Sequence, residues 1–288
     1  MLGNSIRLFT IRGIQVGVHY SWLVIFGLLT WILATSAFPD VLGRYAVVES
    51  WILAAITVLL MFVSVLIHEL AHSFVALARG LKANSITLFA FGGVSSLSGD
   101  AKEASTEFLV AIVGPLTSFA LAGLAYVVAA NIDEPRIDVV FSYLAYINFA
   151  LGVFNLVPGY PLDGGRVLRS ILWGLTNNVR RATEWAGNAG KLVAWGMFAF
   201  ALILIFDGDI INGVWLAAIA WFLHNAASNS VQQVVLETRL RRVRARDVVT
   251  VDEVTVPPGL SVAELIDQYL LPSNRQAVAV TDNGRLVG

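Results

Sequence analysis

The chain has no cysteine and little charge. Only 14% of its 288 residues are charged, against roughly 25% in soluble domains, and 57% are hydrophobic. Without cysteine there is no disulfide and no thiolate ligand, so any metal must be held by His, Asp or Glu. The net charge of -1 gives no reason to expect a nucleic-acid partner. Scarce charge and long apolar runs together indicate a membrane protein.

Apolar segments long enough for membrane helices recur along residues 1–230. A span needs about 20 apolar residues, and about six segments approach that length. We predict an all-α polytopic membrane protein with spans at residues 20–38, 51–78, 105–130, 137–154, 191–206 and 211–229. Residues 1–18 are not expected to be a signal peptide, because Arg7 and Arg12 interrupt them.

Two stretches outside these spans predict small membrane-associated β-strands. Residues 5–19 partly alternate between apolar and polar, and residues 81–97 are Ser-rich with a break at Gly92-Gly93.

The distribution of Lys and Arg predicts the orientation of the chain in the membrane. With a cytoplasmic N-terminus and six spans, the outer loops hold only Arg44 and Arg136. This bias predicts a multi-pass protein of the cell (plasma or inner) membrane with both termini cytoplasmic.

The second span carries His68, Glu69 and His72, a His-Glu-x-x-His motif. Residues i and i+4 share a helix face, so both imidazoles can aim at one ion, and Glu69 is placed to take a proton from water. Ionisable residues at membrane depth are costly and indicate function. At about 1.5 Å per residue, His68 lies about 25 Å along the span, nearer the cytoplasmic face.

A third ligand must come from elsewhere, since catalytic zinc usually has three protein ligands. Asp163 is the strongest candidate, because it lies in a proline-interrupted segment beside a span. Irregular backbone at that depth is tolerated only when buried in protein or lining a watery cavity. Asn155, earlier in the segment, can donate to a carbonyl or oxyanion. Alternatively, Asp163 is a turn or N-cap residue and Asn155 caps the fourth span.

Three further features favour structural roles. Gly114-Pro115 indicates a packing kink in the third span more than a site. His19 and His224 are more typical of interfacial or core histidines than of ligands. The basic run at residues 239–246 favours a topogenic or headgroup-binding segment.

The two motifs together resemble the site-2 protease family of intramembrane zinc metalloproteases. The resemblance rests on residues 68–72 and on Asn-Leu-Val-Pro-Gly-Tyr-Pro-Leu-Asp-Gly-Gly at residues 155–165, and it covers roughly residues 1–230. It implies one Zn²⁺ per chain, bound by His68, His72 and Asp163. It also implies that Glu69 is the catalytic acid/base and that Asn155 assists carbonyl binding. Gly92-Gly93 would lie near the substrate path, and Gly114-Pro115 matches a recurring helix motif.

The C-terminal region differs in character. Residues 231–242 are expected to form a linker, and residues 243–288 resemble the first two-thirds of a cystathionine-β-synthase (CBS) motif, a partial α/β domain. The motif stops before its last helix and no second copy follows, so nucleotide binding by this tail is not expected.

The predicted function is hydrolysis of peptide bonds within transmembrane segments of membrane-anchored regulatory proteins. Such substrates include anti-sigma factors and membrane-tethered transcription factors, and the process is regulated intramembrane proteolysis. The expected partners are this substrate and the lipid bilayer, and homodimerisation is left open. The alternative is a metal-binding membrane chaperone or transporter, in which Glu69 would be dispensable. No internal repeat typical of transporters is evident.

Overall fold

The computed structural model describes residues 5–42, 47–89, 92–98, 101–240, 254–271, 278–282 and 284–287. Its contacts divide the chain into two units, Met1–Val235 and Leu236–Gly288. Five described helices are long and apolar enough to cross a membrane: Val47–Ala78, Ala104–Asn131, Pro135–Asn155, Val179–Phe206 and Ile210–Gln232. A shorter apolar helix, Ser21–Ala37, occupies the first predicted span. The predicted polytopic helical fold is confirmed.

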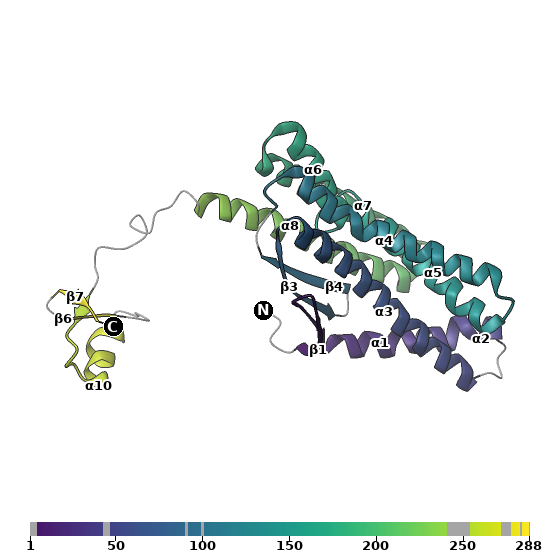
Figure 1. The fold of residues 1–288 in the computed structure, drawn as a ribbon, viewed down its shortest axis with the longest axis horizontal. Helices are drawn as coiled ribbons and strands as arrows, with labels where there is room; N and C mark the ends of the chain where they lie inside the picture. The colour runs from purple at the N-terminus through teal and green to yellow at the C-terminus, as the bar shows by residue number, and fades with distance from the viewer. Residues whose placement is uncertain are drawn as a thin grey trace. The chain divides into compact units, whose positions relative to one another are not determined.

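The first unit is a helix bundle with a small sheet (Figure 1). Its helical elements are α1 (Ser21–Ile32), the π-helical turn η1 (Leu33–Ala37), α2 (Phe38–Leu42), α3 (Val47–Ala78), α4 (Ala104–Asn131), α5 (Pro135–Asn155), α6 (Asp163–Thr176), α7 (Val179–Phe206) and α8 (Ile210–Leu240), whose last turn extends past Val235, the final residue of this unit.

Two helices extend beyond the predicted spans. Helix α7 begins at Val179 rather than near Lys191, because the Asn178 side chain caps it by accepting from the Arg181 N–H at 3.1 Å. Helix α8 continues through most of the predicted linker to Leu240. The predicted spans therefore cover only the apolar part of α7 and of α8.

Helix α3 is uninterrupted because Val47–Ala78 contains neither Gly nor Pro. It ends where Gly80 adopts a positive φ of 80°. The Leu81 N–H then donates to the Ala76 carbonyl and the Gly80 N–H to the Leu77 carbonyl, both at 3.0 Å. This Schellman arrangement satisfies carbonyls that the helix end would leave unpaired.

The sheet lies against one face of α3. Its strands are β1 (Ser5–Ile11), β2 (Ile14–His19), β3 (Lys82–Phe89) and β4 (Gly92–Ser98), in the order β1-β2-β3-β4. β2 and β3 are parallel, whereas β1–β2 and β3–β4 are antiparallel. Ile14, Ala83 and Ile86 pack with Leu66, Leu70, Phe74 and Leu77 of α3. The small strands agree with the predicted fold class, whereas the predicted break at Gly92-Gly93 is wrong: both glycines belong to β4, where they pair with Phe89 and Leu88. β4 is an edge strand.

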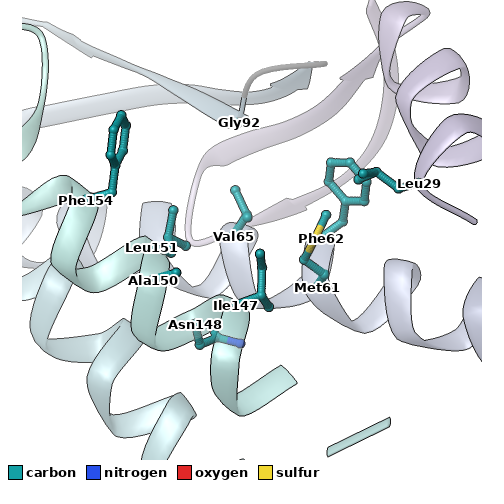
Figure 2. Close-up of a pocket in the computed structure, with 10 residues that line it drawn as sticks. All are labelled: Leu29, Met61, Phe62, Val65, Gly92, Ile147, Asn148, Ala150, Leu151 and Phe154. Carbon is teal, nitrogen blue, oxygen red and sulfur yellow. The ribbon is translucent and has the colours of Figure 1, made fainter. Parts of the chain in front are cut away.

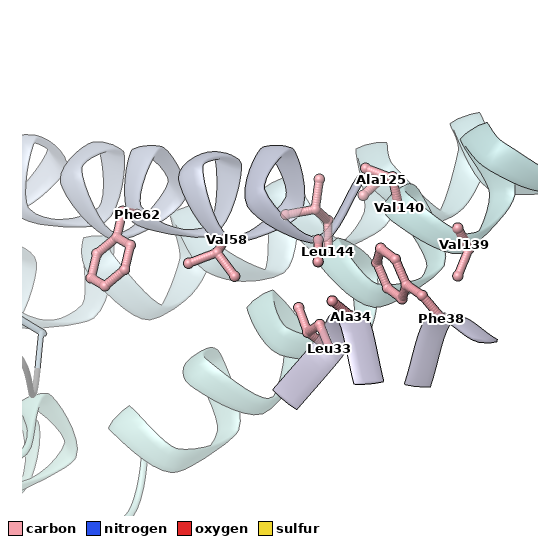
Figure 3. Packing of buried hydrophobic residues seen from close by; sticks show 10 residues of the cluster. Leu33, Ala34, Phe38, Val58, Phe62, Ala125, Val139, Val140 and Leu144 are labelled. Carbon is pink, nitrogen blue, oxygen red and sulfur yellow. The ribbon is translucent and has the colours of Figure 1, made fainter. Parts of the chain in front are cut away.

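A hydrophobic cluster joins η1 and α2 to α3, α4 and α5 (Figure 3). Its buried members are Leu33, Ala34, Phe38, Ala54, Val58, Phe62, Ala125, Val139, Val140 and Leu144. The cluster fixes the first apolar helix against the three helices that carry or border the motif residues.

The second unit has a three-stranded sheet in the order β5-β6-β7, formed by Thr255–Val256, Ala279–Asp282 and Arg285–Leu286. Helix α10 (Val262–Leu265), with a capping box between Ser261 and Glu264, leads into a π-helical turn, η2 (Ile266–Leu270). Residues 241–253 and 272–277 lie outside the described residues, and so does most of the basic run. The CBS-like tail and the domain bounds stay predictions.

We predict that Phe38→Ala destabilises the bundle, because Phe38 is 0% exposed in the cluster. In water-soluble cores this truncation costs about 3–5 kcal/mol; here the loss should be smaller, because lipid also accommodates apolar side chains. Thermal unfolding in detergent measures it. Val24→Ala, at a side chain 74% exposed, is the control and should not change Tm. Equal Tm values for the two variants would contradict the described packing.

Candidate metal centre

The two motif histidines point toward α4 from the face of α3 away from the sheet. Both are 4% exposed, and their Nε2 atoms lie 3.1 Å apart. His72 Nδ1 donates to the Val110 carbonyl at 2.6 Å, and His68 Nδ1 shares a hydrogen bond with Ser118 Oγ at 2.8 Å. These contacts fix both ring orientations and leave the Nε2 atoms facing a common point.

Asp163 reaches the same point from the start of α6. Its Oδ2 lies 3.2 Å from His68 Nε2 and 3.1 Å from His72 Nε2. The connection from α5 turns closely under α6, where a Cβ on Gly164 or Gly165 would overlap the backbone of residues 156–160. The glycine pair therefore permits the turn that places Asp163 beside the histidines.

The donor set fits a zinc ion. The Val110 carbonyl can only accept, so a neutral His72 carries its proton on Nδ1 and presents a lone pair at Nε2. That lone pair faces a carboxylate oxygen at 3.1 Å, a repulsive arrangement that a cation between them relieves. Tetrahedral zinc with bonds of about 2.0–2.1 Å separates its ligand atoms by about 3.3 Å, close to the observed spacing. Among the described residues, His68, His72 and Asp163 form the one group found that could hold a metal.

Gly114 provides the space for this group. A Cβ there would lie 2.6 Å from His68 Nε2 and would also overlap the His72 ring. The sequence favoured a packing kink at Gly114-Pro115; the close approach of Gly114 to both histidine rings corrects that interpretation. The only signal in the sequence was the resemblance of this pair to a family motif.

Glu69 faces the sheet edge at β4. A Cβ on Gly93 would lie 2.5 Å from Glu69 Cγ, and the Ser95 side chain is within hydrogen-bonding reach of the carboxylate. Gly93 therefore lets the edge strand pass directly over Glu69. The predicted catalytic acid/base and the predicted substrate strand are neighbours.

Asn155, His19 and His224 are the other residues that the sequence raised as possible site residues. Asn155 is the last residue of α5, at the beginning of the turn that leads to Asp163. His19 and His224 stand apart from the donor group: His19 Nδ1 hydrogen-bonds Ser21 Oγ at 2.9 Å, and the His224 ring lies 5.6 Å from that of Trp195. Among the described residues, neither histidine has two further His, Asp or Glu side chains grouped with it as possible metal ligands.

Comparison with known proteins assigns the family. Residues 56–134 and 130–204 match the family described as Peptidase family M50. The chain belongs to peptidase family M50. It is 39% identical over 290 residues to a zinc metalloprotease named Rip3 from Mycobacterium tuberculosis, covering 99% of this chain and 74% of the relative. It is 33% identical over 289 residues to Zinc metalloprotease MJ0392 from Methanocaldococcus jannaschii, covering 100% of this chain and 78% of the relative.

A solved structure agrees with this M50 assignment. The site-2 protease from Methanocaldococcus jannaschii superimposes with a TM-score of 0.55 at 30% identity, covering 79% of this chain and 95% of that one. The resemblance stated from the motifs is confirmed. This M50 chain is a zinc-dependent protease and a multi-pass membrane protein of a family that cleaves proteins within membranes. The alternative of a non-hydrolytic chaperone or transporter is therefore set aside.

We predict that Gly114→Ala strongly weakens zinc binding while the helices still form, because the added methyl occupies the space beside both Nε2 atoms. Zinc affinity should fall by about 100-fold or more, the upper end of losses seen when groups around a metal are disturbed. Metal analysis after dialysis against a chelator measures this. Gly123→Ala on the same helix is the control, since a Cβ there meets nothing within 4 Å. Full zinc retention by Gly114→Ala would contradict the site.

Proposed function

We propose that the chain cuts single-span, membrane-anchored regulatory proteins within their transmembrane segment. The observation that carries this proposal is the convergence of His68, His72 and Asp163 at one point, with Glu69 beside them and β4 above. We assign the first three residues as the zinc ligands and Glu69 as the catalytic acid/base.

Bound zinc supplies a Lewis acid that makes water more acidic and polarises a carbonyl. Glu69 takes the proton of the attacking water and passes it to the leaving amine. The Asn155 amide donates to the carbonyl oxygen as negative charge develops there. Val110 and Ser118 hold the imidazoles in the orientation that the reaction needs.

The substrate must unwind, because a transmembrane helix hides its peptide bonds in its own hydrogen bonds. We propose that the unwound segment pairs with the edge strand β4 near Gly92-Gly93, so that its peptide bonds pass over Glu69. An edge strand offers unpaired backbone groups to an added strand. β4 is thus suited to present an extended segment to the reacting groups.

A cavity of about 390 Å³ adjoins this path between α1, α3, α5 and β4 (Figure 2). Three of its lining residues are close in sequence to the reaction centre: Val65 lies one turn before Glu69, Gly92 precedes Gly93, and Phe154 precedes Asn155. We propose that it accepts an apolar side chain of the substrate next to the cleaved bond.

The cytoplasmic side is the proposed destination of the product. Lys and Arg concentrate on the segments that would face the cytoplasm, which supports cytoplasmic termini and a site nearer that face. Release there suits a substrate whose soluble part acts in the cytoplasm, such as an anti-sigma or transcription factor.

Glu69→Gln should greatly slow proteolysis and retain zinc, because the amide cannot accept the proton of water. We expect kcat to fall by about 10²- to 10⁴-fold on a transmembrane peptide in proteoliposomes, the usual contribution of a general acid/base. Glu49→Gln, at the opposite end of α3, is the matched control and should cleave normally. A Glu69→Gln variant as active as wild type would exclude the proposed mechanism.

Ala150→Phe should change substrate preference, because Ala150 lines the cavity. Cleavage of a peptide with Leu or Phe beside the scissile bond should lose about tenfold or more in kcat/KM, whereas a peptide with Ala there should lose little. Val153→Phe adds similar bulk at a residue 47% exposed and should leave both peptides unaffected. Equal losses on both peptides would show that the cavity does not select side chains.

A further inference from the structure

A buried ion pair joins α4 to α6 outside the donor group. Glu107, in the first turn of α4, is 0% exposed, and the Arg169 side chain on α6 is 15% exposed. Arg169 Nε donates to Glu107 Oε1 at 2.6 Å, and its Nη2 pairs with the same oxygen. The guanidinium also lies 5.7 Å from the centroid of the Tyr160 ring, in the turn that leads to Asp163.

Packing alone does not explain this pair. Removing two charges from water is costly, and apolar side chains of similar volume often stabilise a protein as well or better. A guanidinium that engages one carboxylate with two nitrogens does, however, fix the relative position of two helices more narrowly than apolar contact does. What the ion pair does for the protein therefore depends on which parts of the fold it holds together.

The pair lies in line with the groups that orient the histidines. Glu107, Val110, Gly114 and Ser118 follow one stripe of α4 at i, i+3, i+7 and i+11. Along this stripe, Val110 holds His72, Gly114 leaves space for the donor atoms, and Ser118 holds His68. On the other side of the pair, Arg169 belongs to the helix that begins with Asp163 and contacts the turn before it.

We infer that Glu107 and Arg169 are positioning residues for zinc: their ion pair holds the third ligand on α6 against the histidine-orienting stripe of α4. This inference rests on the proposed ligands His68, His72 and Asp163. Without the pair, α6 and its Asp163 can move relative to α4, and the three donor atoms no longer converge. Zinc affinity should therefore depend on two side chains that never touch the metal.

The test is zinc affinity measured by chelator competition on purified, folded protein. Arg169→Gln and Glu107→Gln should each weaken zinc binding by about 10- to 100-fold, as removal of groups supporting metal ligands does. The double variant Glu107→Gln/Arg169→Gln leaves no buried unpaired charge and should bind zinc more tightly than Arg169→Gln alone. The visible spectrum of bound Co²⁺ should change in the single variants, because it reports ligand geometry.

Arg180→Gln is the matched control, since it breaks an exposed ion pair with Glu184 on α7 and should leave zinc affinity unchanged. If Arg169→Gln does not fold, Arg169→Lys replaces it: the charge stays, the two-nitrogen contact is lost, and weaker zinc binding is still expected. Wild-type affinity and Co²⁺ spectrum in a folded Arg169 variant would overturn the inference. His68→Ala, measured in parallel, separates the two claims, because retention of zinc there would refute the ligand assignment itself.

Discussion

The structure depends on holding three lone-pair-bearing atoms together inside an apolar bundle. His68 Nε2, His72 Nε2 and Asp163 Oδ2 lie 3.1–3.2 Å from one another, at side chains that are nearly or largely buried. Such an arrangement is unfavourable without a cation and favourable with one. The pitch of α3 aligns the histidines, the stripe on α4 orients their rings, and the glycine turn before α6 delivers the carboxylate.

The membrane adds a second constraint, which concerns the substrate. A peptide bond inside a transmembrane helix is hydrogen-bonded and shielded, so hydrolysis needs both water and an extended chain. We propose that the sheet holds the extended chain, because it packs against the face of α3 opposite the donor group and its edge strand passes over Glu69 at Gly93. One helix thus carries the two donor histidines on one face and, on the other, supports the sheet that we propose as the substrate platform.

Local spacing in the sequence was enough to predict much of this arrangement. The i, i+4 histidines, the acid in a proline-broken segment and the apolar runs led to the helical membrane fold and to the three residues that the structure brings together. The role of Gly114 could not be read in the same way, because its neighbours are imidazoles from another helix. The Glu107–Arg169 pair likewise joins residues 62 positions apart, and only packing brings them into contact.

Anomalous diffraction at the zinc absorption edge, on crystals of the zinc-loaded protein, tests the central claim most directly. The claim predicts one strong peak within bonding distance, about 2.0–2.2 Å, of His68 Nε2, His72 Nε2 and an Asp163 carboxylate oxygen. A peak held by other residues, or zinc bound to the histidines with Asp163 turned away, would contradict it.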